Sequence, residues 1–211
     1  MYVSILGDSI STYEGFNPPG HAVYYDSAYR CLNGLTSVYD TWWAKVNQYL
    51  KAYLCINNAW SGSRVCGDFP AASHPRRTGA LHTEQAQPDL ILVYMGFNDF
   101  AGGSSAGAFE AAYDATVAAL QANYPRAWIF CGTLMRSKLA DDPGWVFPRN
   151  LLGEDVEDYN AAIRRVCRRR NCVLADLAAR NVRYETLDGT HPTAAGHAAM
   201  ARCWIDCLRR S

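Results

Sequence analysis

Two short segments at opposite ends of the chain carry residue types that together could perform nucleophilic chemistry. Ser9 follows a short apolar run over residues 2–6, after Gly-Asp. A serine hydroxyl is a poor nucleophile unless a base takes its proton. Near the other end, Asp188 precedes His191 by three residues, so one turn can bring the carboxylate and the imidazole into hydrogen-bond contact. We therefore interpret Ser9 as a nucleophile, His191 as its general base and Asp188 as the group that orients the base.

Two further polar segments follow strand-like runs in the middle of the chain. Residues 58–64, which include Gly62, come after the run 53–56, and residues 96–99, which include Asn98, come after the run 90–95. In open α/β folds the carboxyl ends of parallel strands meet at one edge of the sheet, where ligands bind. We therefore expect both segments to lie near Ser9.

Ser9, Gly62, Asn98 and His191, in that order and each in its own motif, resemble the four blocks of the SGNH (GDSL-type) hydrolase family. The resemblance extends from residue 7 to residue 192. It implies a serine esterase that forms an acyl-enzyme and needs no cofactor and no metal. It further implies small ester substrates, with O-acetyl groups on carbohydrates as the expected target. Two alternatives stay open: a lipase- or thioesterase-type hydrolase of longer acyl chains, and a non-catalytic carbohydrate-binding domain on the same fold.

Acyl transfer through a serine places negative charge on the carbonyl oxygen, so hydrogen-bond donors must already point at that oxygen. The candidates for this oxyanion hole are the backbone N–H groups of Ser9 and Gly62 and the side-chain amide of Asn98. A glycine suits position 62 because no Cβ obstructs the approach of substrate to the backbone.

Substrate contacts are expected from two long connections and from the segment around Gly62. Residues 13–39 and 133–153 are rich in aromatic residues interleaved with polar ones, and we expect them to form the walls of the pocket. The predicted substrate-binding residues are Arg64, Tyr25, Trp60 and Trp145. For Arg64, a salt bridge to a neighbouring acid is the alternative.

The hydrophobic pattern predicts an α/β fold formed by one domain over residues 1–211. Strand-like runs at 2–6, 53–57, 90–95, 127–131 and 172–175 alternate with helical patterns, as in a parallel sheet covered on both faces. Helices are expected to start after Thr41, to cover residues 109–120 and 156–167, and to follow Thr193. Right-handed crossovers favour a three-layer α/β/α arrangement with the flavodoxin-like strand order 2-1-3-4-5.

Composition argues against several classes of partner. The 20 Lys and Arg residues balance the 20 Asp and Glu residues, which gives no electrostatic reason to expect nucleic acid or an anionic membrane as partner. The arginines between residues 164 and 170 are interpreted as a solvated helix face. Of the eight cysteines, several fall at core positions, and none shows the spacing of zinc ligands, so no metal is expected. We expect a cytoplasmic protein, or a secreted one if a leader was removed; the oligomeric state stays open.

Overall fold

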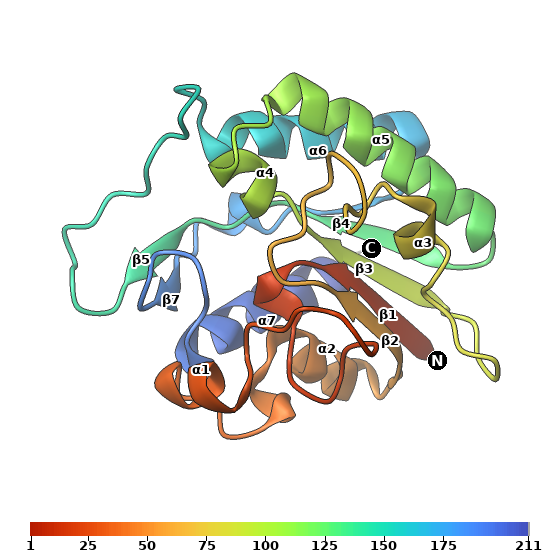
Figure 1. The fold of residues 1–211 in the computed structure, drawn as a ribbon, viewed down its shortest axis with the longest axis horizontal. Helices are drawn as coiled ribbons and strands as arrows, with labels where there is room; N and C mark the ends of the chain where they lie inside the picture. Colours follow the sequence, from red (N-terminus) through yellow and green to blue (C-terminus); the bar gives the residue numbers. More distant parts are fainter. Residues whose placement is uncertain (211) are drawn as a thin grey trace.

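A five-stranded parallel sheet forms the centre of the structure, a computed structural model that describes residues 1–210 (Figure 1). The strand order is β2-β1-β3-β4-β6, which confirms the predicted order because β5 belongs to another sheet. The strands of the central sheet are β1 (Tyr2–Gly7), β2 (Tyr53–Ala59), β3 (Leu90–Tyr94), β4 (Trp128–Gly132) and β6 (Val173–Ala175). All five residues of β3 are buried, as expected for a central strand covered on both faces.

Helices cover both faces of this sheet, which confirms the α/β/α prediction. Helices α2 and α7 pack together on one face, and α5 and α6 pack together on the other (Figure 1). The helices are α1 (Ser27–Leu32), α2 (Trp42–Leu50), α3 (Pro75–Thr78), α4 (Phe97–Ala101), α5 (Ala106–Asn123), α6 (Val156–Arg170) and α7 (Ala194–Leu208). Short 3-10 helices cover Ser9–Ser11, Val38–Asp40 and Ala178–Arg180.

The long helices begin where capping residues satisfy free backbone N–H groups. The Thr41 hydroxyl accepts a hydrogen bond from the N–H of Ala44 at the start of α2. At the start of α7, the Thr193 hydroxyl accepts one from the N–H of Gly196 at 3.1 Å. The four helices predicted from hydrophobic periodicity are therefore confirmed, whereas the short helices α1, α3 and α4 were not predicted.

A second, two-stranded parallel sheet lies beside the carboxyl edge of the central sheet. It consists of β5 (Ser137–Leu139) and β7 (Tyr184–Thr186), and the sequence pattern did not predict it. The loop that follows β7 carries the predicted base. The Ser137 hydroxyl donates to the carbonyl of Gly189 at 2.6 Å, and Thr186 accepts from the N–H of Gly189 at 3.0 Å. This small sheet therefore fixes the position of the 188–191 loop.

Aromatic packing joins the helices on one face, and ion pairs join them on the other. Trp42 of α2 stacks on Trp204 of α7 with ring centroids 5.2 Å apart, and both side chains are fully buried. On the opposite face, the α6 arginines pair with Glu110 and Asp114 of α5, for example Arg165 with Glu110 at 2.8 Å. Exposed pairs of this kind contribute little individually, about 0–1 kcal/mol. Among residues 1–210, no helix combines the length and apolar character needed to cross a membrane.

Candidate active site

Three predicted residues form one continuous hydrogen-bonded chain at the carboxyl edge of the sheet. Nε2 of His191 lies 2.9 Å from Oγ of Ser9, and Nδ1 of His191 lies 2.7 Å from Oδ2 of Asp188. Ser9 follows β1, while the other two residues follow β7, 182 positions away from Ser9 in the case of His191. With Nδ1 carrying a proton that it donates to Asp188, Nε2 is free to accept the serine proton. The arrangement is suited to a base-activated serine.

Asp188 is held in its charged form by several donors. Its Oδ1 accepts the backbone N–H groups of Thr190 at 2.9 Å and His191 at 2.7 Å. Burial raises the pKa of Asp188, but the hydrogen bonds from the His191 side chain and from these backbone groups outweigh it and hold the pKa well below its usual range. A carboxylate fixed in this way favours one tautomer of His191 and stabilises the imidazolium that proton transfer would form.

The turn that presents Ser9 depends on the buried carboxyl of Asp8. One oxygen of Asp8 accepts the N–H of Ile10 at 3.0 Å and caps the 3-10 helix Ser9–Ser11. Burial raises the pKa of Asp8 to about 7, because the charged form is poorly solvated there. Asp8 therefore has a structural role, which is to cap the turn that presents Ser9.

Gly62 occupies a turn position that a side chain would disturb. The turn runs from Trp60 to Ser63, whose N–H donates to the carbonyl of Trp60 at 3.1 Å. Gly62 is its third residue and has φ +78°, a conformation that favours glycine. Nothing lies within 4 Å of the position that its Cβ would take. Within residues 1–210, the N–H of Gly62 has no hydrogen-bond acceptor, so this donor is available to a ligand.

Hydrogen bonds join Asn98 on α4 to the segment that carries Gly62. Nδ2 of Asn98 donates to the carbonyl of Ser63 at 2.9 Å. The next residue, Asp99, is fully buried and accepts the N–H groups of Val65 at 2.7 Å and Cys66 at 2.9 Å. Because the amide of Asn98 has two N–H bonds, one stays available after this contact. The two predicted oxyanion segments therefore form one rigid unit.

Tyr24 contacts the predicted base directly, although sequence reasoning did not select it. Its ring stacks on that of His191 with centroids 3.4 Å apart and an interplanar angle of 8°, and its hydroxyl donates to Oδ2 of Asp188 at 3.1 Å. Its N–H donates to the Thr12 hydroxyl at 2.9 Å, which in turn donates to the carbonyl of Ser9 at 2.8 Å. Burial and the charge of Asp188 raise the pKa of Tyr24 to about 12, so the hydroxyl stays a donor.

The prediction that Tyr25 binds substrate is wrong. Its side chain is 0% exposed, and its hydroxyl donates to the carbonyl of Pro192 at 2.8 Å. Tyr25 therefore supports the loop that carries His191, and its side chain is not accessible to a ligand. The ring of the neighbouring Tyr24 lies 4.9 Å from that of Tyr25 and contacts the base instead. The loop 13–39 reaches the site as expected, but through Tyr24.

Trp145 lies where the prediction placed it, in the wall of a cavity beside His191. This cavity has a volume of about 350 Å³ and includes Asn98, Asp188 and His191 among its lining residues. Its remaining walls come from α4 and from the two loops around it: Phe97, Phe100, Ala101, Trp145, Phe147, Pro148, Gly189 and Thr190. The loop 133–153 thus borders the predicted reaction centre with aromatic rings.

Trp60 and Arg64 lie on the segment that carries Gly62. The N–H of Trp60 donates to the carbonyl of Gly7 at 3.1 Å, which places this residue beside the end of β1, and its ring lies 4.2 Å from that of His21. The guanidinium of Arg64 packs against Gly102 at the end of α4. Arg64 is exposed and lowers the pKa of Asp99 only through its charge, while burial raises it. Both residues stay predicted substrate contacts.

Arg77 is a second supporting residue that the sequence did not reveal. It is 1% exposed and donates to the carbonyls of Gly7 at 3.2 Å and Asn58 at 2.8 Å, and to Oδ1 of Asn58 at 2.6 Å. Burial lowers the pKa of Arg77 to about 10. It ties the end of β1, next to Ser9, to the end of β2, which leads to Gly62.

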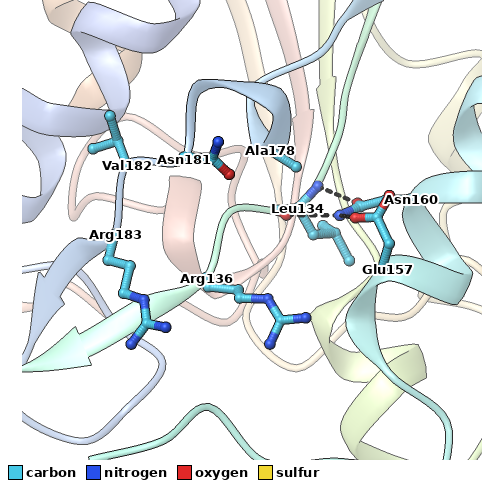
Figure 2. A pocket seen from close by; sticks show the side chains of 8 residues that line it. All are labelled: Leu134, Arg136, Glu157, Asn160, Ala178, Asn181, Val182 and Arg183. Atoms are coloured by element: carbon cyan, nitrogen blue, oxygen red, sulfur yellow. Dashed lines mark hydrogen bonds between the residues drawn. The ribbon is translucent and has the colours of Figure 1, made fainter.

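A larger cavity, about 430 Å³, lies away from these residues and lacks comparable chemistry (Figure 2). Asn160 bridges the N–H and the carbonyl of Leu134 at 2.7 and 3.0 Å, as the dashed lines show. Arg136 in its wall is paired with Asp155 at 2.6 Å. Asn160 and Arg136 are thus already engaged by protein groups, and the lining of this cavity includes no serine, cysteine or histidine. The smaller cavity beside His191 is the candidate active site.

Comparison with known proteins assigns the chain to a family. Residues 5–199 match the GDSL-like lipase/acylhydrolase family, and the chain belongs to this family. A multidomain esterase from Ruminococcus flavefaciens is 23% identical over 212 residues, which cover 97% of this chain. The match covers 23% of that esterase, so the chain spans about a quarter of the length of this relative.

Solved structures share the fold over the whole chain. A GDSL-like lipase from Bacteroides ovatus has a TM-score of 0.76 at 24% identity, with coverage of 100% of this chain and 98% of that one. An active-site mutant of a family two carbohydrate esterase from Clostridium thermocellum has a TM-score of 0.64 at 18% identity, with coverage of 100% and 63%. These similarities confirm the α/β fold and the strand order.

Proposed function

We propose that this chain is a serine esterase that hydrolyses small acyl esters, with O-acetyl groups on carbohydrates as its substrate class. The hydrogen-bonded chain from Ser9 through His191 to Asp188, with contacts of 2.9 and 2.7 Å, is the observation that carries the proposal. Membership of the GDSL-like lipase/acylhydrolase family supports it independently.

In the proposed reaction, His191 Nε2 takes the proton of the Ser9 hydroxyl while Oγ attacks the carbonyl carbon of the ester. The tetrahedral oxyanion accepts hydrogen bonds from the N–H groups of Ser9 and Gly62 and from the Asn98 amide. His191 then gives its proton to the departing alcohol oxygen, which leaves an acyl group on Ser9. Water attacks this acyl-enzyme with His191 again as base, and the acid and the free serine are released.

The cavity beside His191 supports a small polar ester. Its volume of about 350 Å³ lies at the lower end of the usual range for small-molecule sites. Aromatic rings such as that of Trp145 line it together with the polar side chains of Asn98 and Thr190, and no Leu, Ile, Val or Met takes part. Ring faces pack well on sugars, and polar side chains can bind hydroxyl groups. The carbohydrate esterase among the structural relatives makes this substrate class a natural one to test.

Hydrolysis of esters with a longer acyl chain is the second candidate function, because Phe97, Phe100 and Phe147 make one side of the same cavity apolar. Relative rates on p-nitrophenyl esters separate the two. We expect higher kcat/KM on the acetate than on the decanoate, and release of acetate from acetylated oligosaccharides. A steady rise of kcat/KM with acyl length would favour the second candidate.

Labelling with a fluorophosphonate tests the nucleophile and separates an esterase from a non-catalytic binding domain. Wild-type protein should be labelled at Ser9, because only an activated serine reacts. Ser9→Ala should abolish labelling. Ser61→Ala is the matched control, since Ser61 neighbours Gly62 and should leave labelling unchanged. Unlabelled wild-type protein would contradict the proposal.

A further inference from the structure

Three cysteines that are far apart in the sequence converge on the side of the sheet covered by α6. Cys131 lies in β4, Cys167 in the last turn of α6, and Cys172 directly before β6. Their sulfur atoms all lie within 4.8 Å of one another, and Sγ of Cys131 is 3.8 Å from Sγ of Cys172. Cys131 and Cys167 are buried, Cys172 is half-buried, and all three are free thiols. Packing alone does not require three thiols to face one point.

The spacing of these sulfurs suits a shared metal ion. With a metal–sulfur bond of about 2.3 Å, the sulfurs of a tetrahedral site lie about 3.8 Å apart and those of a trigonal site about 4.0 Å apart. The separation of 3.8 Å between Cys131 and Cys172 has this value. A disulfide would need sulfurs about 2.05 Å apart and would involve only two of the three residues.

Neighbouring groups shift the pKa values of two of these thiols in opposite directions. Hydrogen bonds with the thiols of Cys131 and Cys167 lower the pKa of Cys172, and the charge of Arg170 lowers it further. Hydrogen bonding with the two neighbouring thiols, together with burial, raises the pKa of Cys131. Thiolate is the form of cysteine that binds metal ions.

Two features border the cysteine cluster: the buried hydroxyl of Tyr113 and a surface cavity at Cys172. The Tyr113 side chain is fully buried against Cys131, yet within residues 1–210 its hydroxyl makes no hydrogen bond of acceptable geometry. An orphaned buried donor is costly, and a metal-bound thiolate would be a better acceptor for it than a neutral thiol. Cys172 also lines a cavity of about 240 Å³ that includes Gln121 and Trp128. The cluster therefore borders this cavity at Cys172, while Cys131 and Cys167 lie deeper.

We propose that Cys131, Cys167 and Cys172 form a binding site for a thiophilic divalent cation of the zinc or cadmium class. The three sulfurs bind the ion, and the fourth position faces the cavity beside Cys172, where water completes the coordination. The three cysteines bind the cation as thiolates and release their protons to solvent, which leaves a complex of net charge −1 next to Arg170. The ion joins β4, α6 and the start of β6, and so stabilises the folded chain.

Titration of the reduced protein with Cd²⁺ tests this site without any use of esterase activity. We expect one ion per chain, a thiolate-to-cadmium charge-transfer absorption, and a rise in Tm of about 5–10 °C when free Cd²⁺ exceeds its Kd 100-fold. Because the thiols lose their protons when they bind the ion, the apparent affinity should fall as the pH is lowered. Absence of the absorption at stoichiometric Cd²⁺ would overturn the proposal.

Single substitutions locate the ion. Cys131→Ala, Cys167→Ala and Cys172→Ala should each weaken Cd²⁺ binding more than about tenfold and remove the Tm shift. Cys172→Ala is the most informative, because Cys172 is half-buried and its loss disturbs the core least. Cys55→Ala removes a buried cysteine of β2 outside the cluster and should bind as wild type does. Unchanged binding by Cys172→Ala, or equal loss in Cys55→Ala, would contradict the site.

Discussion

Two histidines six residues apart, His191 in the loop after β7 and His197 in α7, occupy opposite environments. Both ring nitrogens of His191 have partners, Ser9 and Asp188, and its side chain is 17% exposed. His197 is 0% exposed; its Nδ1 accepts the N–H of Trp42 at 3.2 Å, and within residues 1–210 its Nε2 has no partner. Burial lowers the pKa of His197 to about 3.

The difference shows what makes a histidine chemically useful. A base must accept a proton, so it needs a nearby anion that stabilises its charged form. It must also contact the atom that gives up the proton. His191 has the carboxylate of Asp188 on one side and the Ser9 hydroxyl on the other. His197 lacks a paired anion, and its neutral ring caps the first turn of α2. His191 is therefore placed to act as a base, whereas His197 has a structural role.

The largest expected effect is loss of activity when His191 is replaced. His191→Ala should lower kcat at least about 10³-fold, and Ser9→Ala should do the same, because residues of a triad act as a unit. The double variant should be no worse than either single one. Steady-state kinetics on p-nitrophenyl acetate and thermal melting give the test. Stability should change by less than about 1 kcal/mol, since neither substitution removes a large apolar side chain from the core. Retention of a tenth of wild-type kcat would refute the assigned role.

Asp188→Asn should have the next largest effect. The amide keeps the shape of the carboxylate but cannot stabilise the imidazolium, and it favours the wrong tautomer of His191. We expect kcat to fall about 10²–10⁴-fold. Asp142→Asn, which changes an exposed acid in the loop 133–153, is the control and should leave kcat unchanged. Equal kinetics for Asp188→Asn and wild type would remove Asp188 from the mechanism.

Replacement of His197 should show the opposite pattern, with a loss of stability and little change in kcat. His197→Ala leaves the N–H of Trp42 without its acceptor and opens a cavity between α2 and α7. We expect a loss of about 2 kcal/mol in the free energy of unfolding, measured by urea titration. If His197→Ala melted as wild type does but lost its activity, His197 would have a role in catalysis and not in stability.

The pH dependence of this loss gives a sharper test. The pKa of His197 is about 3 in the folded protein, against an ordinary value of 6.5. Between these values the unfolded chain binds a proton that the folded protein does not, so the contribution of His197 is present above pH 6.5 and is lost as the pH falls. The destabilisation by His197→Ala should therefore shrink by about 2 kcal/mol between pH 7 and pH 5. The raised pKa of Asp8 makes the free energy of unfolding fall as the pH rises. This contribution is the same in wild type and in His197→Ala, so it cancels in the difference between them.

The regular elements and the Ser9–His191–Asp188 chain were predictable because each has a local signal. β3 is a continuous apolar run, β1 is an apolar run interrupted only by Ser4 before its final glycine, and Thr41 and Thr193 mark the starts of helices. Asp188 and His191 are three residues apart, so their contact depends on one turn. The strands β5 and β7, with three residues each, depend on pairing between distant segments and carry no period of their own.

The missed residues lie where side-chain direction is decided by tertiary contacts. The loop that carries Tyr24 and Tyr25 has no periodicity, so the sequence does not tell which ring faces His191 and which is buried. His197 is fully buried and caps α2, because α2 packs over α7, and this contact between distant segments has no signal in the sequence. The cysteines at 131, 167 and 172 become neighbours only when β4 pairs with β6 beneath α6.

We expect the smallest effect on activity from substitution of Tyr24. Its ring stacks on His191, and its hydroxyl donates to Asp188, the anion beside that histidine. Tyr24→Phe keeps the ring stacked on His191 but removes the hydrogen bond of 3.1 Å to Asp188. One hydrogen bond to a partly exposed carboxylate contributes about 1 kcal/mol, so kcat should fall about 3–10-fold with little change in KM.

Tyr24→Leu removes the stacked ring as well and should lower kcat further than Tyr24→Phe, because the imidazole is then free to rotate away from Ser9. Tyr29→Phe is the matched control, since Tyr29 contacts Tyr24 with ring centroids 5.0 Å apart but has no contact with the triad. If Tyr24 instead binds substrate, both Tyr24 variants would raise KM and leave kcat unchanged. That result would assign Tyr24 to substrate binding and not to the orientation of His191.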